Sequence, residues 1–298
     1  MRRLGEEDPG RSRGFALPRA RDVQPVGNPE NPVASGTPPM KSLAKFLRPL
    51  GSALLLWCSS SLAHAVEPIP DKLVVLTFDD SVANHATYVA PLLKKYGFRA
   101  TFFITEGFEF LTDKEHYLTW EQITSLHADG FEIGNHTRSH KGVASIADPN
   151  QLREEVEFLE QRCVAHGIPR PTTFCYPGYG TSVFAVRLLR ERAYRFARSG
   201  GSRVYDPTKD DPLTLPQAFD GKPASTLEQF QAAVEGAKDG KIAILTFHGV
   251  PDIRHPWVST DREKFESYME HLKNTGCRVI ALGDLAKYIP EPPAPKNP

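Results

Sequence analysis

Short apolar runs alternate with amphipathic segments through most of this 298-residue chain. The runs are rich in β-branched and aromatic side chains and are bounded by polar or turn-forming residues, as strands are. Seven runs are expected to be strands, at residues 73–77, 99–105, 131–135, 173–175, 195–198, 242–247 and 278–281. Because strands that alternate with helices form parallel sheets, the pattern predicts an α/β fold of about seven strand-helix units.

The amphipathic segments between these runs predict the helices, at residues 85–96, 120–129, 150–166, 184–193, 227–237 and 261–274. The third segment is the clearest. Leu152 and Val156 repeat in it at helical spacing. Asp148 or Asn150 can cap its first turn, and Pro149 suits that turn because its fixed φ is helical.

Two acidic residues, Asp79 and Asp80, stand at the carboxyl end of the first apolar run. Acidic side chains beside a buried strand are costly unless something there requires negative charge, and a metal ion would meet that condition. Neighbouring residues in extended backbone point in opposite directions. We therefore expect one carboxylate to bind a metal ion and the other to do different work.

Two histidines, His136 and His140, follow the third run. Residues four apart share one face of a helical turn, so both imidazoles could converge on one ion. Two histidines and one aspartate leave coordination positions open for water and substrate, as in catalytic zinc sites. Singly, an acidic pair is more often a helix cap or solvated turn, and such histidines usually lie on the surface. Their joint occurrence after two predicted strands favours an active site, because α/β barrels place theirs at those strand ends.

Four motifs carry a resemblance to one enzyme family. They are Thr77-Phe78-Asp79-Asp80, His136-Thr137-Arg138-Ser139-His140, Phe174-Cys175-Tyr176-Pro177-Gly178-Tyr179-Gly180 and Leu245-Thr246-Phe247-His248. In their order and rough spacing, residues 72–288 resemble the polysaccharide deacetylases with a NodB homology domain, carbohydrate esterase family 4. The resemblance implies an α/β fold, a distorted (β/α)7 barrel of NodB type in a single domain.

The resemblance also implies catalytic roles. Asp79 matches the family's catalytic base, and His248 matches the general acid that protonates the leaving amine. Asp80, His136 and His140 match the ligands of a divalent metal ion. Zn²⁺ is expected there, with Co²⁺, Ni²⁺ or Fe²⁺ as alternatives.

Substrate-binding residues are expected on the loops that follow the later strands. A backbone N–H of the Pro177-Gly178-Tyr179 turn, from either Gly178 or Tyr179, would hold the oxyanion. Leu245 resembles the apolar residue that lines the acetyl pocket. Trp257 could stack on a sugar ring, and plain loop packing is the alternative. The same two alternatives apply to Phe108, Phe110, Tyr117 and Tyr179, whereas His85 is expected to be a surface or packing residue without a partner.

Departures from the family pattern concern the surroundings of the two catalytic groups. Cys175 stands where the family has an arginine that pairs with the base, so another residue must orient that base. Ser81 replaces a glycine that often follows the acidic pair. The Asp-x-x-Asp-Trp motif that tunes the acid histidine is not recognisable, and Asp206, Asp210 and Asp211 in its interval are assigned no role.

The first 65 residues differ in character from the rest. Residues 1–39 are rich in Arg, Pro and Gly, and we expect a disordered or over-annotated extension. Residues 40–65 combine a basic start, an apolar stretch at 50–62 and the small residues Ala63 and Ala65, which predicts a signal peptide cleaved after Ala65. A retained anchor is the alternative. The deacetylase domain would cover residues 66–290 of a secreted or periplasmic protein, ahead of a disordered tail at 291–298.

Composition limits the class of protein. The chain is 40% apolar and 24% charged, as ordinary globular proteins are, and its net charge of +0 gives no reason to expect a nucleic-acid partner. No stretch is long and apolar enough for a permanent membrane span. Cys163, Cys175 and Cys277 are too few for a disulfide framework and are expected to be buried side chains, with a catalytic thiol at Cys175 as the alternative.

These observations predict a metal-dependent hydrolase that removes N-acetyl groups from a polysaccharide or oligosaccharide of the chitin, peptidoglycan or poly-N-acetylglucosamine type. An O-acetyl xylan esterase of the same family is one alternative, and a non-catalytic glycan-binding pseudoenzyme is another. Asp79 and His248 count against the pseudoenzyme. Two histidines and a carboxylate also describe non-haem iron oxygenases, but the alternating strands and helices argue against that class.

Overall fold

Eight strands form one sheet within residues 66–290, the part of the chain that this computed structural model describes. They are β1 (Leu73–Phe78), β2 (Thr101–Ile104), β3 (Glu132–Asn135), β4 (Thr173–Cys175), β5 (Phe196–Arg198), β6 (Phe219–Asp220), β7 (Ala243–Phe247) and β8 (Arg278–Ile280). All of their pairings are parallel, in the order β5-β4-β3-β2-β1-β7-β6, with β8 paired to β1. Their carboxyl ends therefore share one rim.

β1 lies at the centre of the sheet and contacts three strands. β7 pairs with it from Val74 to Phe78, β8 pairs with its first half, and β2 pairs with its last two residues. Every residue of β1 is buried. A strand buried on both faces explains why its sequence is almost continuously apolar up to the acidic pair.

The segment between β5 and β7 closes the sheet into a distorted barrel. Leu215 forms a parallel bridge with Arg198 of β5, and a few residues later β6 pairs with β7. One short piece of chain therefore contacts both edges of the sheet. The predicted α/β barrel is confirmed, and β6 is the strand that the hydrophobic pattern did not predict, because it has only two residues.

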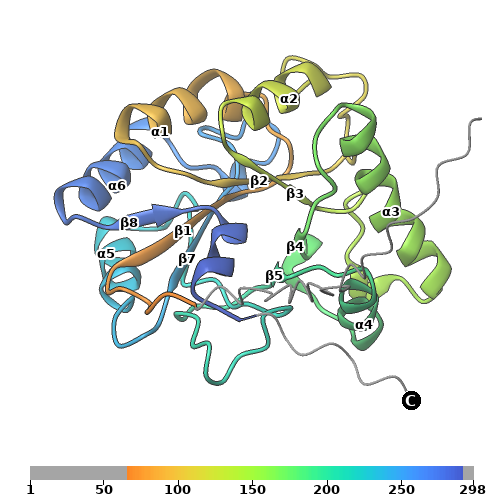
Figure 1. Cartoon of the computed structure of the whole chain (residues 1–298). Helices are drawn as coiled ribbons and strands as arrows, with labels where there is room; N and C mark the ends of the chain where they lie inside the picture. Colours follow the sequence, from red (N-terminus) through yellow and green to blue (C-terminus); the bar gives the residue numbers. More distant parts are fainter. Residues whose placement is uncertain (1–65, 291–298) are drawn as a thin grey trace, which may run out of the picture. The chain divides into compact units, whose positions relative to one another are not determined.

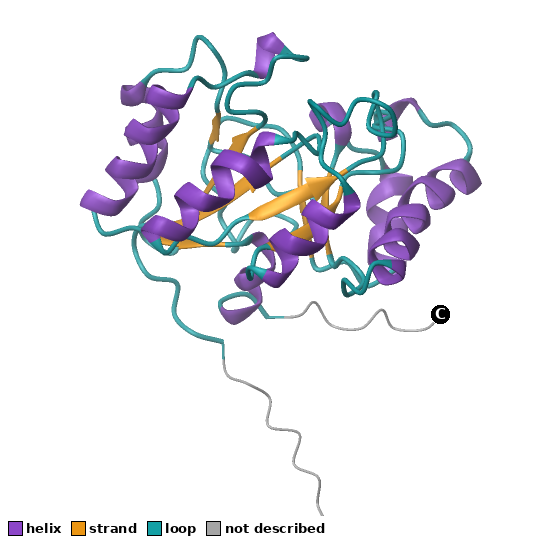
Figure 2. Cartoon of the chain, turned by 90° about the horizontal axis from the view of Figure 1, so that it is seen from above, coloured by secondary structure: helices purple, strands orange, loops and turns teal. Residues whose placement is uncertain are grey.

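Six α-helices surround the strands, as Figures 1 and 2 show. They are α1 (Ala90–Tyr96), α2 (Trp120–Ala128), α3 (Pro149–Ala165), α4 (Val183–Glu191), α5 (Leu227–Glu235) and α6 (Arg262–Asn274). The side chains of Thr119, Asp148, Ser182, Thr226 and Asp261 cap five of them by accepting backbone N–H groups. The predicted cap at Asp148 is confirmed, and the helix predicted at 85–96 divides into a π-helical turn, His85–Val89, followed by α1.

The two faces of β1 and β7 pack into different cores. Val74, Leu76 and Leu245 join the apolar side chains of α1, α2, α5 and α6 outside the barrel. Val75 and Ile244 face the interior, which the side chains of the last 3₁₀ segment (Leu282–Lys287) fill from the amino ends of the strands. The interior is thus filled at one end and leaves polar side chains at the carboxyl rim.

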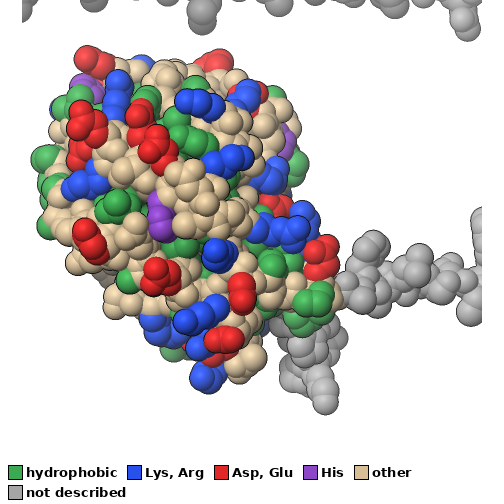
Figure 3. Space-filling view, turned by 90° about the vertical axis from the view of Figure 1, so that its left-hand side faces the viewer, with side chains coloured by type: hydrophobic (Ala, Val, Ile, Leu, Met, Phe, Trp, Pro, Cys, Tyr) green, Lys and Arg blue, Asp and Glu red, His purple; other side chains and the backbone are tan. Residues whose placement is uncertain are grey.

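The terminal predictions, at residues 1–39, 40–65 and 291–298, lie outside the described residues. Within residues 66–290, no helix is long and apolar enough to cross a membrane. Acidic and basic side chains are intermixed on the face drawn in Figure 3, in keeping with the balanced charge of the sequence.

Candidate active site

The two acidic residues follow β1 directly but do not continue its extended backbone. Asp79 still donates its N–H to the Phe247 carbonyl of β7, 3.0 Å away. Asp80 then turns into the left-handed region, with φ of 72°. Both carboxylates consequently line one cavity, so the expectation that they point in opposite directions is wrong. The reason is that the strand has already ended at Phe78.

The two histidines are brought together by an irregular loop after β3. Thr137 and His140 have φ of 64° and 56°, and no helix forms between His136 and His140. The helical turn expected from their spacing is therefore wrong, although the convergence of the two imidazoles is not. Glu155 of α3 holds the loop, because its carboxylate accepts the backbone N–H and the hydroxyl of Ser139 at 2.8 and 2.7 Å.

A glycine on the neighbouring loop permits this arrangement. A Cβ atom at Gly107 would lie 2.8 Å from the Cβ of His140 and 2.8 Å from the carbonyl carbon of Ser139. Those distances are too short for real contacts. The loop after β2 can therefore support His140 closely only with glycine at this position.

Asp80, His136 and His140 form a cluster with the geometry of a metal site. Oδ1 of Asp80 lies 3.3 Å from Nε2 of His136 and 3.1 Å from Nε2 of His140. This oxygen is buried and has no hydrogen-bond partner. Nδ1 of His136 lies 2.8 Å from the Cys175 carbonyl, which fixes the tautomer that leaves Nε2 free to bind a cation. The three residues therefore fit a divalent ion.

The electrostatics of this cluster favour an ionised carboxylate. Burial raises the pKa of Asp80, but the neighbouring imidazoles of His136, His140 and His248 together outweigh it, and the pKa lies well below its usual value. A deprotonated Asp80 beside two imidazoles is the form that ligates metals.

Asp79 is held by an arginine that the sequence analysis missed. Nη2 of Arg198, at the end of β5, donates to Oδ2 of Asp79, and both side chains are fully buried. Nη1 of Arg198 donates to Gln217 at 2.9 Å, and the guanidinium lies over the Tyr179 ring at 5.5 Å. Burial raises the pKa of Asp79, but Arg198 and the nearby histidines lower it further, so it stays below its usual value.

The position of Arg198 explains why a cysteine, Cys175, can stand where the family has an arginine. Nη2 of Arg198 lies 2.7 Å from the Cys175 sulfur, so the guanidinium occupies space next to the small thiol. An arginine on β5 thus takes the place of the one expected on β4. The sequence did contain a signal that could have identified Arg198. It is a charged residue at the carboxyl end of a predicted strand, as Asp79 and His136 are polar residues directly after theirs.

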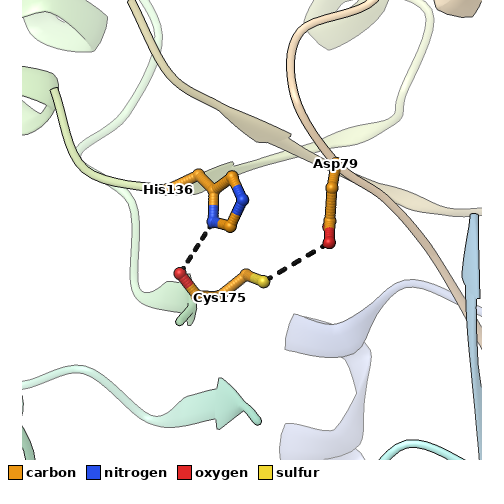
Figure 4. Close-up of side chains that lie close together, drawn as sticks. All are labelled: Asp79, His136 and Cys175. Carbon is orange, nitrogen blue, oxygen red and sulfur yellow. Dashed lines mark hydrogen bonds between the residues drawn. The ribbon is translucent and has the colours of Figure 1, made fainter. Parts of the chain in front are cut away.

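Cys175 also touches the other side of the site. Figure 4 shows its sulfur directed toward Asp79, at 3.6 Å, and its carbonyl directed toward His136. Burial raises the pKa of the thiol. Since thiolates are the nucleophilic form, the catalytic-thiol alternative is disfavoured, and Cys175 is a buried packing residue as expected.

His248 follows β7 and faces the two carboxylates. Its Nε2 lies 3.8 Å from Asp79 and 3.9 Å from Asp80, while its buried Nδ1 has no hydrogen-bond partner. Three acidic residues lie in the interval where the Asp-x-x-Asp-Trp motif would be expected. Asp206 forms an ion pair with Lys209, Asp210 with Arg203 and Asp211 with Arg190.

His85 was expected to lack a partner, but the structure gives it one. It is fully buried, packs against the rings of Phe78 and Phe102, and has its Nε2 3.0 Å from the carbonyl oxygen of His248. Burial lowers the pKa of His85 to about 4, so the ring is neutral near pH 7. It is a packing residue with a partner.

A cavity of about 190 Å³ opens at this rim of the barrel. It is lined by Asp79, Asp80, Phe108, His136, His140, Gly178, Tyr179, His248, His255, Trp257 and Val258. Of the predicted substrate-binding residues, Gly178, Tyr179 and Trp257 line it. Pro177 is buried in the turn below them.

Leu245, and two of the aromatic residues for which stacking or packing was left open, lie elsewhere. Leu245 belongs to the core between the sheet and the helices, so its predicted place in the acetyl pocket is wrong. The reason is strand alternation, since Thr246 shares its face of β7 with His248, and Leu245 takes the other face. Phe110 and Tyr117 are about 1% exposed and pack in the same core.

The turn after β4 has one N–H already occupied. Tyr179 donates its N–H to the Tyr176 carbonyl at 2.9 Å. Its hydroxyl donates to Asp220 at 2.9 Å, which fixes the ring against Arg198. Of the two N–H groups considered for an oxyanion, Gly178 is therefore the better placed.

Comparison with known proteins agrees with this geometry. Residues 67–197 match the family model for polysaccharide deacetylase. The chain is 32% identical to the Bacillus subtilis protein YxkH over 111 residues, which are 37% of this chain and 39% of YxkH. It is 24% identical to a peptidoglycan-N-acetylglucosamine deacetylase of Bacillus cereus over 225 residues, 74% of this chain and 91% of that protein.

One solved structure links the fold to a metal-containing relative. A family 4 acetyl xylan esterase from Clostridium thermocellum, in complex with a cobalt ion, superposes with a TM-score of 0.50 at 26% identity. The match covers 72% of this chain and 90% of that one. The family model, these relatives and the shared barrel lead to one conclusion: residues 67–197 of this chain belong to the polysaccharide deacetylase family.

Proposed function

We propose that residues 66–290 form a metal-dependent deacetylase that hydrolyses N-acetyl groups of a glycan. The observation that carries the proposal is the convergence of Asp80, His136 and His140 on one point beside Asp79, whose carboxylate is fixed by Arg198. A divalent ion held by the three residues would polarise the acetyl carbonyl and lower the pKa of a bound water. Zn²⁺ is our first choice, with Co²⁺, Ni²⁺ or Fe²⁺ as alternatives.

Asp79 is proposed as the general base. Its low pKa keeps it ionised near neutral pH, and the Arg198 guanidinium restricts the directions in which its second oxygen can point. Oδ1 of Asp79 is buried and has no hydrogen-bond partner, so it is available to accept a proton from water.

The acid and the oxyanion donor come from two other strand ends. His248, which lines the cavity at the end of β7, would deliver a proton to the leaving amine. The Gly178 N–H would hold the oxyanion of the tetrahedral intermediate. Tyr179 and Trp257 would contact the sugar that carries the acetyl group.

The substrate class is proposed from the relatives and from the cavity. The Bacillus cereus relative is named for peptidoglycan N-acetylglucosamine, which is an N-acetylated glycan. Chitin and poly-N-acetylglucosamine present the same acetamido group. An O-acetyl esterase on xylan is the alternative, and the similarity to the acetyl xylan esterase favours testing it. A glycan-binding pseudoenzyme would have no need of Asp79 and His248.

We further propose that the enzyme acts outside the cytoplasm. Its polymeric substrates lie in cell walls or in extracellular matrices, and residues 40–65 have the pattern of a signal peptide. Residues 66–290 would then be the deacetylase domain of a secreted or periplasmic protein.

Acetate release tests the proposal. Purified protein would be assayed on N-acetylglucosamine oligomers, peptidoglycan and acetylated xylan, before chelation, after chelation, and after addition of zinc, cobalt, nickel or iron. We expect release from an N-acetylated glycan that is lost on chelation, restored by metal and abolished in Asp79→Asn. Activity confined to xylan would support the esterase instead. Full activity in the chelated protein or in Asp79→Asn would refute the mechanism.

A further inference from the structure

The loop between β7 and α6 forms one wall of the cavity and is held at both of its ends. The Asn84 side chain accepts the N–H of Val250 at 3.0 Å and donates to the Pro251 carbonyl at 2.6 Å. Farther along, the N–H of Thr260 donates to the Gly249 carbonyl at 3.2 Å. Side chains on this loop are therefore presented to the cavity from a fixed backbone.

The loop carries a carboxylate-imidazole pair, Asp252 and His255. Nδ1 of His255 lies 3.5 Å from Oδ1 of Asp252, which also accepts the His255 N–H at 2.8 Å. The N–H of Asp252 is bonded in turn to the Ser259 hydroxyl. Both side chains are less than about a tenth exposed, and neither Nδ1 of His255 nor Oδ2 of Asp252 has a hydrogen-bond partner.

This pair leaves one ring nitrogen of His255 for a ligand. The imidazole lines the cavity, and Nδ1 is turned to Asp252. The Asp252 carboxylate raises the pKa of His255, although burial opposes it. With Nδ1–H turned to the carboxylate, Nε2 of the neutral ring is therefore a hydrogen-bond acceptor on the cavity side, as in a catalytic or ligating histidine whose second nitrogen is oriented by a carboxylate.

Aromatic rings flank the imidazole on two sides. The Phe108 ring lies 4.5 Å from it and the Trp257 ring 5.4 Å from it. Trp257 is 66% exposed and Phe108 is 42% exposed, which is unusual for such large apolar side chains. A polar acceptor between two exposed rings suits a sugar, whose apolar face stacks on aromatic groups while its hydroxyl and acetamido N–H groups donate hydrogen bonds.

We propose that His255 is a substrate-binding residue that accepts a hydrogen bond from a hydroxyl or N–H group of the sugar at the cavity mouth, and that Asp252 positions it. The inference rests on the proposed function, because it names the group that recognises the glycan part of the substrate. His255 belongs to neither of the metal-type clusters found within residues 66–290. Its contribution is therefore to glycan recognition rather than to acetyl hydrolysis itself.

A matched pair of the same type lies outside the cavity. Asp113 and His116 are also three residues apart, with Nδ1 of His116 2.9 Å from Asp113, but His116 lines a separate hollow. His116→Phe therefore controls for the loss of an aspartate-histidine pair beside the site.

The test compares two substrates in three variants. His255→Phe keeps an aromatic ring beside Phe108 but removes the acceptor, and Asp252→Asn removes the charge that orients the imidazole. Each would be assayed, with His116→Phe, on an N-acetylglucosamine oligomer and on 4-nitrophenyl acetate, which has an acetyl group but no sugar. We expect kcat/KM for the oligomer to fall roughly 10- to 100-fold in His255→Phe, chiefly through KM, the size of one lost hydrogen bond to a polar group.

The pattern across substrates decides the outcome. We expect aryl acetate hydrolysis to stay within about twofold of the unsubstituted protein, Asp252→Asn to lose less than His255→Phe, and His116→Phe to lose nothing. An unchanged KM for the oligomer would overturn the proposal. An equal loss on both substrates would overturn it too, because His255 would then act on the acetyl group. If the unsubstituted protein released no acetate from any glycan, the proposed function itself would fail, which is a distinguishable result.

Discussion

Asp79 and Arg198 form an ion pair that is completely enclosed by protein, between the carboxyl ends of β1 and β5. Removing one partner of a buried pair is costly, because the remaining charge has no water to solvate it. The pair therefore ties the orientation and the ionisation of the proposed base to a strand four positions away in the sheet.

Arg198→Met should impair both stability and catalysis. We expect a loss of about 3–5 kcal/mol in unfolding free energy, as for other broken buried pairs, and a fall in kcat of roughly 100-fold, within the usual contribution of a general base. Because Arg198 lowers the pKa of Asp79, its loss should also move the acid limb of the pH-rate profile to higher pH. Urea unfolding and acetate release measured across about pH 4 to 8 test these effects. An unshifted acid limb would contradict the assignment of Asp79.

Exchanging the two positions should recover part of the loss. Cys175→Arg alone would place two guanidinium groups beside one carboxylate, because Arg198 already contacts the Cys175 sulfur. We expect that variant to be unstable. The double variant Cys175→Arg/Arg198→Ala should be more active than Arg198→Ala, since an arginine on β4 could then reach Asp79. Equal activity of the double variant and of Arg198→Ala would show that the cation must come from β5.

His85 should make stability depend on pH. Burial lowers its pKa to about 4 in the folded chain from about 6.5 when unfolded. The unfolded state therefore binds the proton more readily, so the contribution of His85 is fully present above pH 6.5 and is lost as pH falls toward 4, by up to about 3 kcal/mol. Urea unfolding of His85→Phe should show a flatter pH dependence in that interval. His127→Phe, at a partly exposed position of α2, should leave the slope unchanged.

Glu155 should affect metal affinity without touching the metal. Its carboxylate holds Ser139, between the two histidines, by two hydrogen bonds. We expect Glu155→Gln to weaken zinc binding roughly 10- to 100-fold, the usual cost of losing an outer partner of a metal site. Titration of the chelated protein against a zinc indicator measures it. Glu154→Gln, exposed on the same helix, is the control, and equal affinities in the two variants would refute the role.

Metal should also stabilise the folded chain. An ion that binds the folded state alone adds about 2.7 kcal/mol at 100 times its dissociation constant. For a domain of this size that corresponds to a rise of several degrees in melting temperature, at roughly 2–4 °C per kcal/mol. We expect thermal unfolding to show this rise with zinc, and His140→Ala to remove it. A rise of equal size in His140→Ala would place the ion elsewhere.

The sequence by itself determined the strands and the residues at their carboxyl ends. The apolar run of β1 must be buried, and the acidic and imidazole groups directly after β1, β3 and β7 must then meet at one rim because the strands are parallel. That reasoning located Asp79, Asp80, His136 and His140, and it needed no knowledge of how the strands close into a barrel. His248 came from the resemblance of its motif to the family.

Only the tertiary structure decided which side chains touch across that rim. Arg198 reaches Asp79 because β5 and the segment before β6 curve toward β1, and no local pattern encodes that contact between residues 119 positions apart. The left-handed turns at Asp80 and His140 likewise depend on packing against neighbouring loops, such as the close approach of Gly107. Hydrophobic periodicity records burial along one element, whereas the partner of a buried charge is set by distances between elements.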